Sequence, residues 1–258
     1  FRYFDTMKFI AIIPARYAST RFEGKPLADL GGKPVIQHVC ERVREVIPDV
    51  AVATDDIRIF KAVEAFGGKA VMTSDKHRSG TDRCLEAYDN LGSDADVVIN
   101  IQGDEPFVKP DQIRQVMDCF DDPSTDIATL ALPFPHDGSY ADLANPNRPK
   151  VVMDAQGNAL LFSRQVIPFI RGKETDEWPA AFSFHTHIGM YAFRADVLRK
   201  VTRLPQSSLE LAESLEQLRW LQNGYNIKVG ITHAATVGID TPADLEKARE
   251  MLAEGQNL

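Results

Sequence analysis

Short apolar runs alternate with amphipathic stretches along the first half of the chain. The run from Phe9 to Ile13 is apolar at every position, which is typical of a strand buried on both faces. Pro14 has no N–H to donate to a strand ladder, so we expect this strand to end there. A second such run covers Val50 to Ala53, and between the two the apolar residues from Val35 to Ile47 fall on one helical face. This alternation predicts β/α units and a parallel sheet.

The alternation continues to about residue 132. Further strands are predicted at Ala70 to Met72, Val97 to Ile101 and Ile127 to Leu132. Further helices are predicted at Ile57 to Phe66, Leu85 to Leu91 and Pro110 to Phe120. The polar segment from Thr73 to Arg83, between a strand and a helix, is too rich in polar groups for a simple connector.

The pattern changes after residue 132. Residues 133–150 are rich in Pro, Asn and Asp, and Val151 to Ser163 are typical of a β-hairpin. The remaining predicted elements are strands at Ile188 to Phe193 and Ile227 to Ile231, one helix over Ser207 to Gln222, and a last helix capped by Thr241. We therefore predict an α/β fold with a mostly parallel central sheet and an inserted antiparallel layer. Its expected parts are 7–132, 133–194 and 195–258.

Composition and charge exclude several classes of protein. With 258 residues, 44% of them hydrophobic, the chain can bury the core of one α/β domain. Its net charge of -8 disfavours a general binder of nucleic acids or anionic membranes, which would carry a net basic surface. Cys40, Cys84 and Cys119 lie far apart without a C-x-x-C pair, which disfavours a disulfide framework or a zinc site and suits a reducing cytoplasm.

The same chain shows no membrane or export signal. No apolar run approaches the ~20 residues that span a bilayer, and the start lacks the apolar region of a signal peptide. We expect a soluble protein. Met7 is interpreted as the natural start, and residues 1–6 as an upstream extension.

A basic loop follows the first predicted strand. Arg16, Arg21 and Lys25 stand among small residues, and such a loop can direct cations and backbone amides at one polyanion. Ligands of open α/β sheets bind just beyond the carboxyl ends of the strands, where this loop lies. Neither G-x-x-x-x-G-K-[ST] nor G-x-G-x-x-G is present, which disfavours an ATPase of the P-loop class and a dinucleotide-binding protein. A solvated surface loop explains the same charges.

Two acidic residues are candidate metal ligands. Asp104 follows the central strand at Val97 to Ile101, where a carboxylate can hold Mg²⁺ beside substrate phosphates. Asp240 lies just outside the predicted cap of the last helix, and the cap does not need it. Taken alone, the segment from Gly103 to Pro106 favours an ordinary turn, because Gly, Asp and Pro are turn-forming residues. The basic loop after the first strand adds weight to the metal interpretation.

The spacing of these groups resembles that of a known family. The segment from Pro14 to Leu27, P-A-R-Y-A-S-T-R-x-x-G-K-P-L, resembles the signature loop of sugar nucleotidyltransferases, in particular the CMP-Kdo synthetases. The resemblance runs through nearly the whole chain from Met7, in these further segments: A-T-D (53–55), H-x-S-G-T-D-R (77–83), Q-G-D-E-P (102–106), N-P-N-x-x-K-V-V (145–152), F-S-R (162–164), H-x-G-x-Y (187–191), L-E-Q-L-R (215–219) and G-I-D-T-P-x-D-L (238–245). Phe22 and Glu23 stand where the family usually has Leu-Pro, which removes stiffness from the loop and adds an anion.

The resemblance implies a Rossmann-like nucleotidyltransferase fold and a specific reaction. Members join CTP to the eight-carbon acid sugar Kdo, 3-deoxy-D-manno-octulosonate, giving CMP-Kdo and pyrophosphate for lipopolysaccharide biosynthesis. The implied catalytic residues are Arg16, Lys25, Asp104 and Asp240, of which Asp104 and Asp240 hold Mg²⁺. The implied nucleotide-binding residues are Ala15, Arg16, Ser19, Arg21, Lys25, Ser79, Gly80, Thr81, Gln102 and Asp104. The implied sugar-binding residues are Arg83, Arg164, His187, Tyr191, Glu216 and Gln217. A cytoplasmic homodimer, joined through the inserted layer, is also implied.

Other interpretations remain open. Without the family, Glu216 and Gln217 are the wet side of an amphipathic helix, Tyr191 a packed strand residue and His187 a satisfied polar group. The chain also fits another enzyme of related fold, such as a sialic acid cytidylyltransferase, another sugar nucleotidyltransferase or a metal-dependent glycosyltransferase. A nucleotide-binding regulatory module without turnover is the alternative from a different class.

Overall fold

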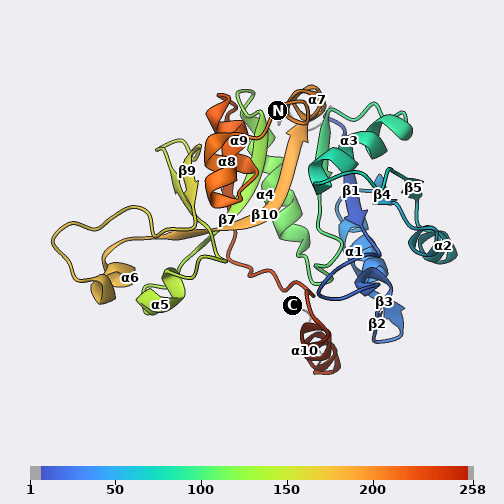
Figure 1. Ribbon diagram of the computed structural model, residues 1–258, viewed down its shortest axis with the longest axis horizontal. Coiled ribbons are helices and arrows are strands. Elements are labelled where there is room, and N and C mark those ends of the chain that lie inside the picture. The colour runs from blue at the N-terminus through green and yellow to red at the C-terminus, as the bar shows by residue number, and fades with distance from the viewer. Residues whose placement is uncertain (1–6, 255–258) are drawn as a thin grey trace. The chain divides into compact units, whose positions relative to one another are not determined.

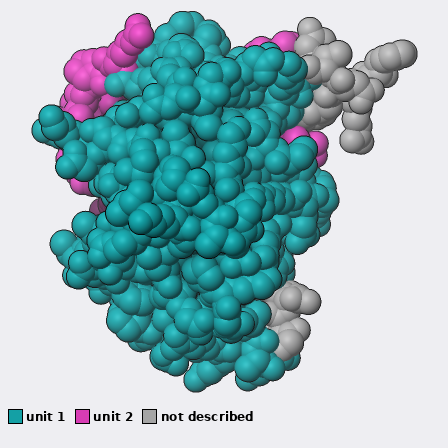
Figure 2. All heavy atoms as spheres, turned by 90° about the vertical axis from the view of Figure 1, so that its right-hand side faces the viewer, with its two compact units in different colours: residues 1–114, 192–202, 236–258 teal, residues 115–191, 203–235 magenta. Residues whose placement is uncertain are grey.

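The computed structural model describes residues 7–254, so the interpretation of residues 1–6 lies outside the described part of the chain. Contacts between Cα atoms divide the chain into two compact units. Within the described residues, unit 1 comprises 7–114, 192–202 and 236–254, and unit 2 comprises 115–191 and 203–235 (Figure 2). The three-part division expected from the sequence stays a prediction.

Unit 1 is built on parallel strands. Its strands are β1 (Phe9–Ala15), β4 (Val50–Thr54), β5 (Ala70–Met72) and β6 (Val97–Asn100). They pair in the order β6-β1-β4-β5, and every pairing is parallel. A small antiparallel pair, β2 (Asp29–Leu30) and β3 (Lys33–Pro34), follows the basic loop. Its helices are η2 (Lys25–Leu27), α1 (Val35–Arg44), α2 (Ile57–Ala65), α3 (Gly80–Asn90), α7 (Ala195–Val201) and α10 (Pro242–Ala253). The five α-helices are labelled in Figure 1.

Unit 2 combines a parallel pair with an antiparallel layer. Its helical elements are η3 (Cys119–Asp121), α5 (Tyr140–Leu143), η4 (Thr175–Glu177), α6 (Trp178–Ala181), α8 (Ser208–Glu213) and α9 (Gln217–Gln222). Its strands are β7 (Ile127–Pro133), β8 (Lys150–Met153), β9 (Ala159–Ser163) and β11 (Ile227–Ile231), with most of β10 (His185–Arg194). Strands β7 and β11 are parallel, whereas β8 pairs antiparallel with both β9 and β10. Helix α4 (Pro110–Asp118) passes from unit 1 into unit 2. The predicted α/β class with inserted antiparallel strands is confirmed.

The prediction that β1 ends at Pro14 is wrong, because β1 continues to Ala15 with Pro14 opposite Ala53 of β4. Ile12 accepts a hydrogen bond from the Ile101 N–H, so Ile12 faces β6, and Pro14, two residues on, faces the same side. The position of the missing Pro14 N–H therefore faces the β6 side, where β6 has already ended, so no hydrogen bond is lost there. The bonds between β1 and β4 do not need this N–H.

The single helix predicted over Ser207 to Gln222 is also wrong, because the structure has two short helices with Ser214 between them. Ser214 adopts a left-handed conformation with φ of 51°. The guanidinium of Arg164 donates to the carbonyl oxygens of Glu213 (2.5 Å) and Ser214 (3.2 Å). The break therefore has a polar partner that the helical periodicity did not reveal.

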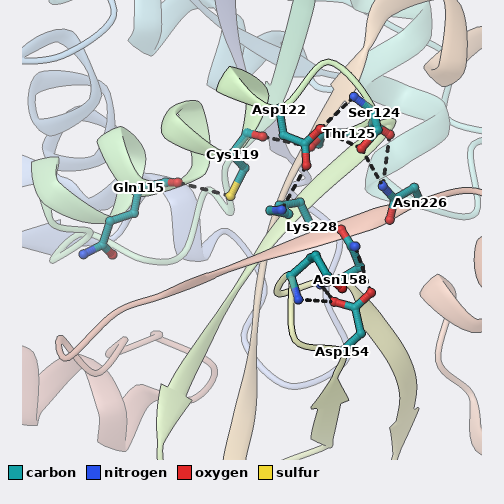
Figure 3. A network of polar contacts seen from close by, with 10 residues as sticks. Gln115, Cys119, Asp122, Ser124, Thr125, Asp154, Asn158, Asn226 and Lys228 are labelled. Atoms are coloured by element: carbon teal, nitrogen blue, oxygen red, sulfur yellow. Dashed lines mark hydrogen bonds and ion pairs between the residues drawn. The ribbon is translucent and has the colours of Figure 1, made fainter.

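A polar network fastens the β8–β9 hairpin turn to β11 within unit 2 (Figure 3). Asp154 accepts from the backbone and side chain of Asn158, and Asn158 forms a bridge with Lys228 of β11. The Lys228 ammonium donates to Asp122 at 3.0 Å. Ser124 likewise bonds Asp122, and its backbone carbonyl accepts from Asn226. The hairpin turn thus lies along part of the β11 edge.

Candidate active site

A cavity of about 330 Å³ opens in unit 1 where β1 and β6 end. Its lining comes from the segment after β1, the start of α3 and the turn after β6: Pro14, Ala15, Arg16, Ala18, Ser19, Thr20, Arg21, Lys25, Pro26, Gly80, Gln102, Gly103 and Asp104. Eight residues of the predicted nucleotide-binding set are among these. The carboxyl ends of parallel strands are the expected place for a ligand in such a sheet.

The basic loop closes on itself. The Gly24 N–H donates to the Tyr17 carbonyl at 2.8 Å, and Gly24 has a φ of 71°, which favours glycine. A Cβ on Gly24 would come within 3.1 Å of the Tyr17 ring, so the ring packs against the glycine backbone. The Arg58 guanidinium also lies over the Tyr17 ring, 3.2 Å from the ring centroid. These contacts fix the position at which Lys25 begins η2.

Arg16 is held by a second loop. Its guanidinium donates to the carbonyl of His77, whose ring bonds to the carboxylate of Glu86 on α3. Glu86 also accepts from the Ser74 N–H at 2.9 Å. The bonds from Ser74 and His77 hold the pKa of Glu86 below its usual value, although burial opposes this. Glu86 therefore positions the loop to which Arg16 is bonded.

The Ser79 to Thr81 segment forms one wall of the cavity. Ser79 caps α3 by accepting from the Asp82 N–H at 3.1 Å, and Thr81 is buried, so Gly80 is the residue of the three that lines the cavity. A Cβ on Gly80 would meet Pro14 Cγ at 3.3 Å. The absence of a side chain lets the start of α3 approach the end of β1.

The two predicted acids and Lys25 come together. The Lys25 ammonium lies 2.5 Å from Asp104 Oδ2 and 3.2 Å from Asp240 Oδ1, and Arg21 lies 3.0 Å from the same Asp240 oxygen. The Ile239 N–H donates to the Asp104 carbonyl at 2.8 Å, which brings the two segments together. Ile239 is buried among Leu30, Val35, Phe107, Leu245 and Ala248.

The capping box of α10 fixes the backbone beside Asp240. Asp244 accepts from the N–H groups of Asp240 and Thr241, at 3.2 and 2.9 Å, while Thr241 caps the helix as predicted. Next to Asp104, burial raises the pKa of Glu105 to about 7, and the charges of Asp104 and Asp240 add to the effect. The carboxylates of Asp104 and Asp240 thus lie together around the Lys25 ammonium.

The predicted sugar-binding residues are divided between the units. Arg83 in unit 1 is fully buried, where it donates to Thr73 at 2.6 Å and pairs with Asp55 at 2.9 Å. Arg164, His187, Tyr191, Glu216 and Gln217 belong to unit 2. Arg164 donates to three backbone carbonyls, those of Pro146, Glu213 and Ser214. Both arginines therefore have protein partners in this structure.

Aromatic rings join several of the unit 2 residues. The ring of His187 lies 5.4 Å from that of Tyr191, which in turn lies 5.0 Å from Trp220. Burial lowers the pKa of His187 to about 3, so the ring is neutral at pH 7. Its Nε2 forms a hydrogen bond with Thr129 Oγ1 at 2.9 Å. Burial, with a smaller effect of Glu216, raises the pKa of Tyr191 well above its usual value. Both side chains are neutral polar groups.

Glu216 and Gln217 complete this set. Glu216 pairs with Arg219 at 3.0 Å. Gln217 is 3% exposed, and its Nε2 has no hydrogen-bond partner among the described residues. An unsatisfied buried amide is uncommon, and a bound ligand is one explanation for it.

The sequence interpretation missed the groups that support the site. Tyr17, Arg58, His77 and Glu86 were not among the predicted residues. His77 lies in the H-x-S-G-T-D-R segment, but its partner Glu86 lies on α3, and no local spacing predicts that pair. Pro14 and Gly103 line the cavity through close backbone contact, which only the glycine at position 103 could have suggested.

Comparisons with known proteins point to one family. A family model described as "Cytidylyltransferase" matches residues 10–229. The chain is 62% identical over 248 residues to a 3-deoxy-manno-octulosonate cytidylyltransferase of Parabacteroides distasonis, covering 96% of this chain and 99% of the relative. It is 49% identical over 254 residues to the enzyme of the same name in Thermodesulfovibrio yellowstonii, with coverage of 95% and 98%.

Solved structures are similar as well. A CMP:2-keto-3-deoxy-manno-octonic acid synthetase complexed with CTP superposes with a TM-score of 0.88 at 45% identity, covering 96% of this chain and 99% of that one. A putative glucose-1-phosphate thymidylyltransferase from Bacillus anthracis gives a TM-score of 0.63 at 17% identity, covering 97% and 96%. This second likeness shows the fold alone.

Proposed function

Because the chain belongs to the cytidylyltransferase family, we propose that it transfers the cytidylyl group of CTP to Kdo, giving CMP-Kdo and pyrophosphate for lipopolysaccharide biosynthesis. The observation that carries the proposal is that Arg16, Arg21, Lys25 and Asp104 line one cavity. At its edge, Lys25 pairs with both Asp104 and Asp240. Cations there suit a triphosphate, and the high identity to Kdo cytidylyltransferases over nearly the full chain supports the sugar.

In this reaction the anomeric oxygen of Kdo forms a bond to the α-phosphorus of CTP. The bond from that phosphorus to the α,β-bridging oxygen breaks, pyrophosphate leaves, and the hydroxyl proton is released. Such a transfer depends on positioning and on stabilising charge, so no side-chain nucleophile is required. Arg16, Lys25 and Arg21 would bind the phosphate oxygens and stabilise the negative charge that develops on the leaving group.

The acids fit a hard divalent cation. Asp104 and Asp240 both direct a carboxylate oxygen at one positive charge, that of Lys25. No group of three or more His, Cys, Asp and Glu side chains within residues 7–254 is arranged to hold a metal. Two carboxylates supplemented by phosphates and water suit Mg²⁺, which keeps several non-protein ligands. When bound, Mg²⁺ would neutralise phosphate charge and polarise the phosphoryl group.

The remaining predicted residues receive roles in substrate binding. Ala15, Ser19, Gln102 and the segment from Ser79 to Thr81 would contact the nucleotide, including the donors and acceptors of the cytosine edge. Arg83, Arg164, His187, Tyr191, Glu216 and Gln217 would contact Kdo. The unsatisfied Nε2 of Gln217 supports its role as a donor to a sugar oxygen.

We further propose a cytoplasmic homodimer. Phe169 and Leu160, in the predicted inserted layer, are 74% and 62% exposed, and a second copy would cover them. The three cysteines are buried and form no disulfide bond within residues 7–254, which suits a reducing compartment. No helix of residues 7–254 is long and apolar enough to cross a membrane.

Pyrophosphate release tests the function. The wild-type protein is incubated with Mg²⁺, Kdo and each of CTP, ATP, GTP and UTP, and CTP is also tested with sialic acid and an amino variant of Kdo. We expect release with CTP and Kdo, loss in Asp104→Ala, and retention in Asp111→Ala, an exposed acid paired only with Arg114 on α4. Release with another pair would reassign the substrate. CTP binding without release under any condition would favour a binding module.

A further inference from the structure

The Lys25 ammonium occupies the position between the two proposed metal ligands. It contacts Asp104 at 2.5 Å and Asp240 at 3.2 Å, and only 17% of the Lys25 side chain is exposed. Arg21 reaches Asp240 as well, but its side chain is 65% exposed. Lys25 is therefore the better-buried cation of the two and the one that contacts both acids.

This contact conflicts with the other role of Lys25. A lysine has one ammonium, which forms up to three hydrogen bonds but is a single charge. While it lies between Asp104 and Asp240, a dication directed at the same oxygens meets a like charge at ion-pair distance. Lys25 also lines the cavity, into which its flexible stem allows the ammonium to turn.

We propose that Lys25 is an exchangeable counter-ion of Asp104 and Asp240, displaced toward the triphosphate when nucleotide binds. Without nucleotide, the ammonium holds the two acids close together. A nucleoside triphosphate draws the ammonium away, and the acids then become available to a divalent cation. Metal binding in the absence of nucleotide is consequently weak. This inference rests on the proposed function, since it assumes that the acids bind metal beside CTP.

Arg16 provides the complementary half of the arrangement. Its guanidinium is bonded to the His77 carbonyl and contacts neither acid, so Arg16 does not compete with the metal. A triphosphate would meet one cation on the His77 side and a second released from the acids. On binding phosphate, Arg16 would leave a backbone carbonyl, whereas Lys25 would leave two carboxylates.

A direct test measures metal binding without turnover. Mn²⁺ is titrated into nucleotide-free protein, and the free ion is followed by electron paramagnetic resonance for wild type, Lys25→Met and the control Lys33→Met. Lys33 forms an exposed pair with Glu41, away from the cavity lining. Asp104→Asn, titrated in parallel, identifies the part of the binding that belongs to this site.

We expect nucleotide-free Lys25→Met to bind Mn²⁺ roughly tenfold more tightly than wild type, within the usual range of coupling between two sites. Lys33→Met should match wild type. The factor by which CTP raises Mn²⁺ affinity should be smaller in Lys25→Met than in wild type, because there is no ammonium left to displace. Circular dichroism verifies folding, and Lys25→Gln, which keeps a donor but no charge, should behave like Lys25→Met.

Other results would overturn the proposal. Equal or weaker Mn²⁺ affinity in both folded Lys25 variants would show that the ammonium is no barrier to metal. Mn²⁺ binding by nucleotide-free wild type that is as tight as binding in the presence of CTP would also show that the ammonium is no barrier to metal. Either result leaves pyrophosphate release by the wild type unaffected, so the proposed function survives it. Absence of Mn²⁺ binding even with CTP would overturn the metal role of the two acids, and the inference with it.

Discussion

At the scale of single residues, the position of the basic loop depends on side chains that need not touch a substrate. Arg58 lies over the Tyr17 ring and is itself held by Asp56, with Nε and Nη2 at 2.9 and 2.6 Å from the carboxylate. Because Tyr17 packs on Gly24, the stack reaches the residue that precedes Lys25. Arg58 is thus a positioning residue for the basic loop.

Replacing Arg58 by Met should raise the KM for CTP about two- to fivefold, since an exposed cation–π contact contributes about 0.5–1 kcal/mol. The turnover number should change little, because the chemical groups remain in place. Steady-state kinetics with varied CTP measures both constants. Arg114→Met, which removes an equally exposed arginine on α4, is the control. Equal KM values for the two variants would show that the stack does not position the loop.

The neutral ring of His187 predicts a pH dependence of stability. Its pKa is about 3 in the folded protein, against an ordinary value of 6.5, so the unfolded state holds more protons between these two pH values. Stability should therefore fall as pH is lowered through this window, by at most about 1.4 kcal/mol per unit from this group. Well above pH 6.5 the ring is neutral in both states, and the group adds no slope.

Urea unfolding at pH 7, 6 and 5 measures this dependence. His187→Gln should lose less stability than wild type over that range, because the glutamine cannot titrate. His233→Gln, at an exposed position, should follow wild type. Parallel curves for His187→Gln and wild type would indicate that the folded ring binds a proton at an ordinary pH.

The charged residues of the candidate site were easier to predict from the sequence than the groups that they contact. Arg16, Arg21, Lys25 and Asp104 could be selected because each stands in a short polar segment after an apolar run. Their partners lie on other elements, as with the His77 carbonyl for Arg16, and no local spacing encodes such a contact. Asp240 could be selected only because the capping box accounted for its neighbours.

At the scale of elements, the site depends on how closely the ends of β1 and β6 approach. A Cβ on Gly103 would lie 2.8 Å from the Pro14 carbonyl oxygen, which is backbone and cannot turn aside. Gly103 separates Gln102 from Asp104, two of the predicted ligand-binding residues. Any shift of this turn moves both.

Gly103→Ala should therefore destabilise the protein by about 1–3 kcal/mol, the usual cost of overpacking, and should also lower turnover. Thermal unfolding and pyrophosphate release measure the two effects. Gly189→Ala is the matched control for stability, because its added Cβ would meet no atom within 4 Å. If the two variants unfold alike, the turn has more freedom than the close contact indicates.

Elements that depend on local pattern were predicted well. The buried runs gave strands β1, β4 and β6, and the Thr241 signal gave the start of α10. The errors arose where distant groups intervene. The continuation of β1 through Pro14 depends on where β6 ends, and the break at Ser214 depends on Arg164, both beyond the reach of periodicity.

At the scale of the whole molecule, the chain does not complete one unit before starting the other. Unit 1 uses three separate stretches of sequence and unit 2 uses two. The sequence predicted the β/α alternation of the first stretch. It did not predict that the chain passes back and forth between the units, because contacts between distant segments decide which unit a segment belongs to. The segment that begins at residue 236 returns to unit 1 and brings Asp240 to Lys25 and Asp104.

This return has a consequence for biosynthesis. A nascent chain that has left the ribosome only as far as residue 235 contains the basic loop and Asp104, but its lysine has no second acid to bridge. Premature termination anywhere before Asp240 therefore yields a product without the acid pair, however well its earlier strands fold. The acid pair therefore depends on a segment that follows unit 2 in the sequence, and not on the first stretch of unit 1 alone.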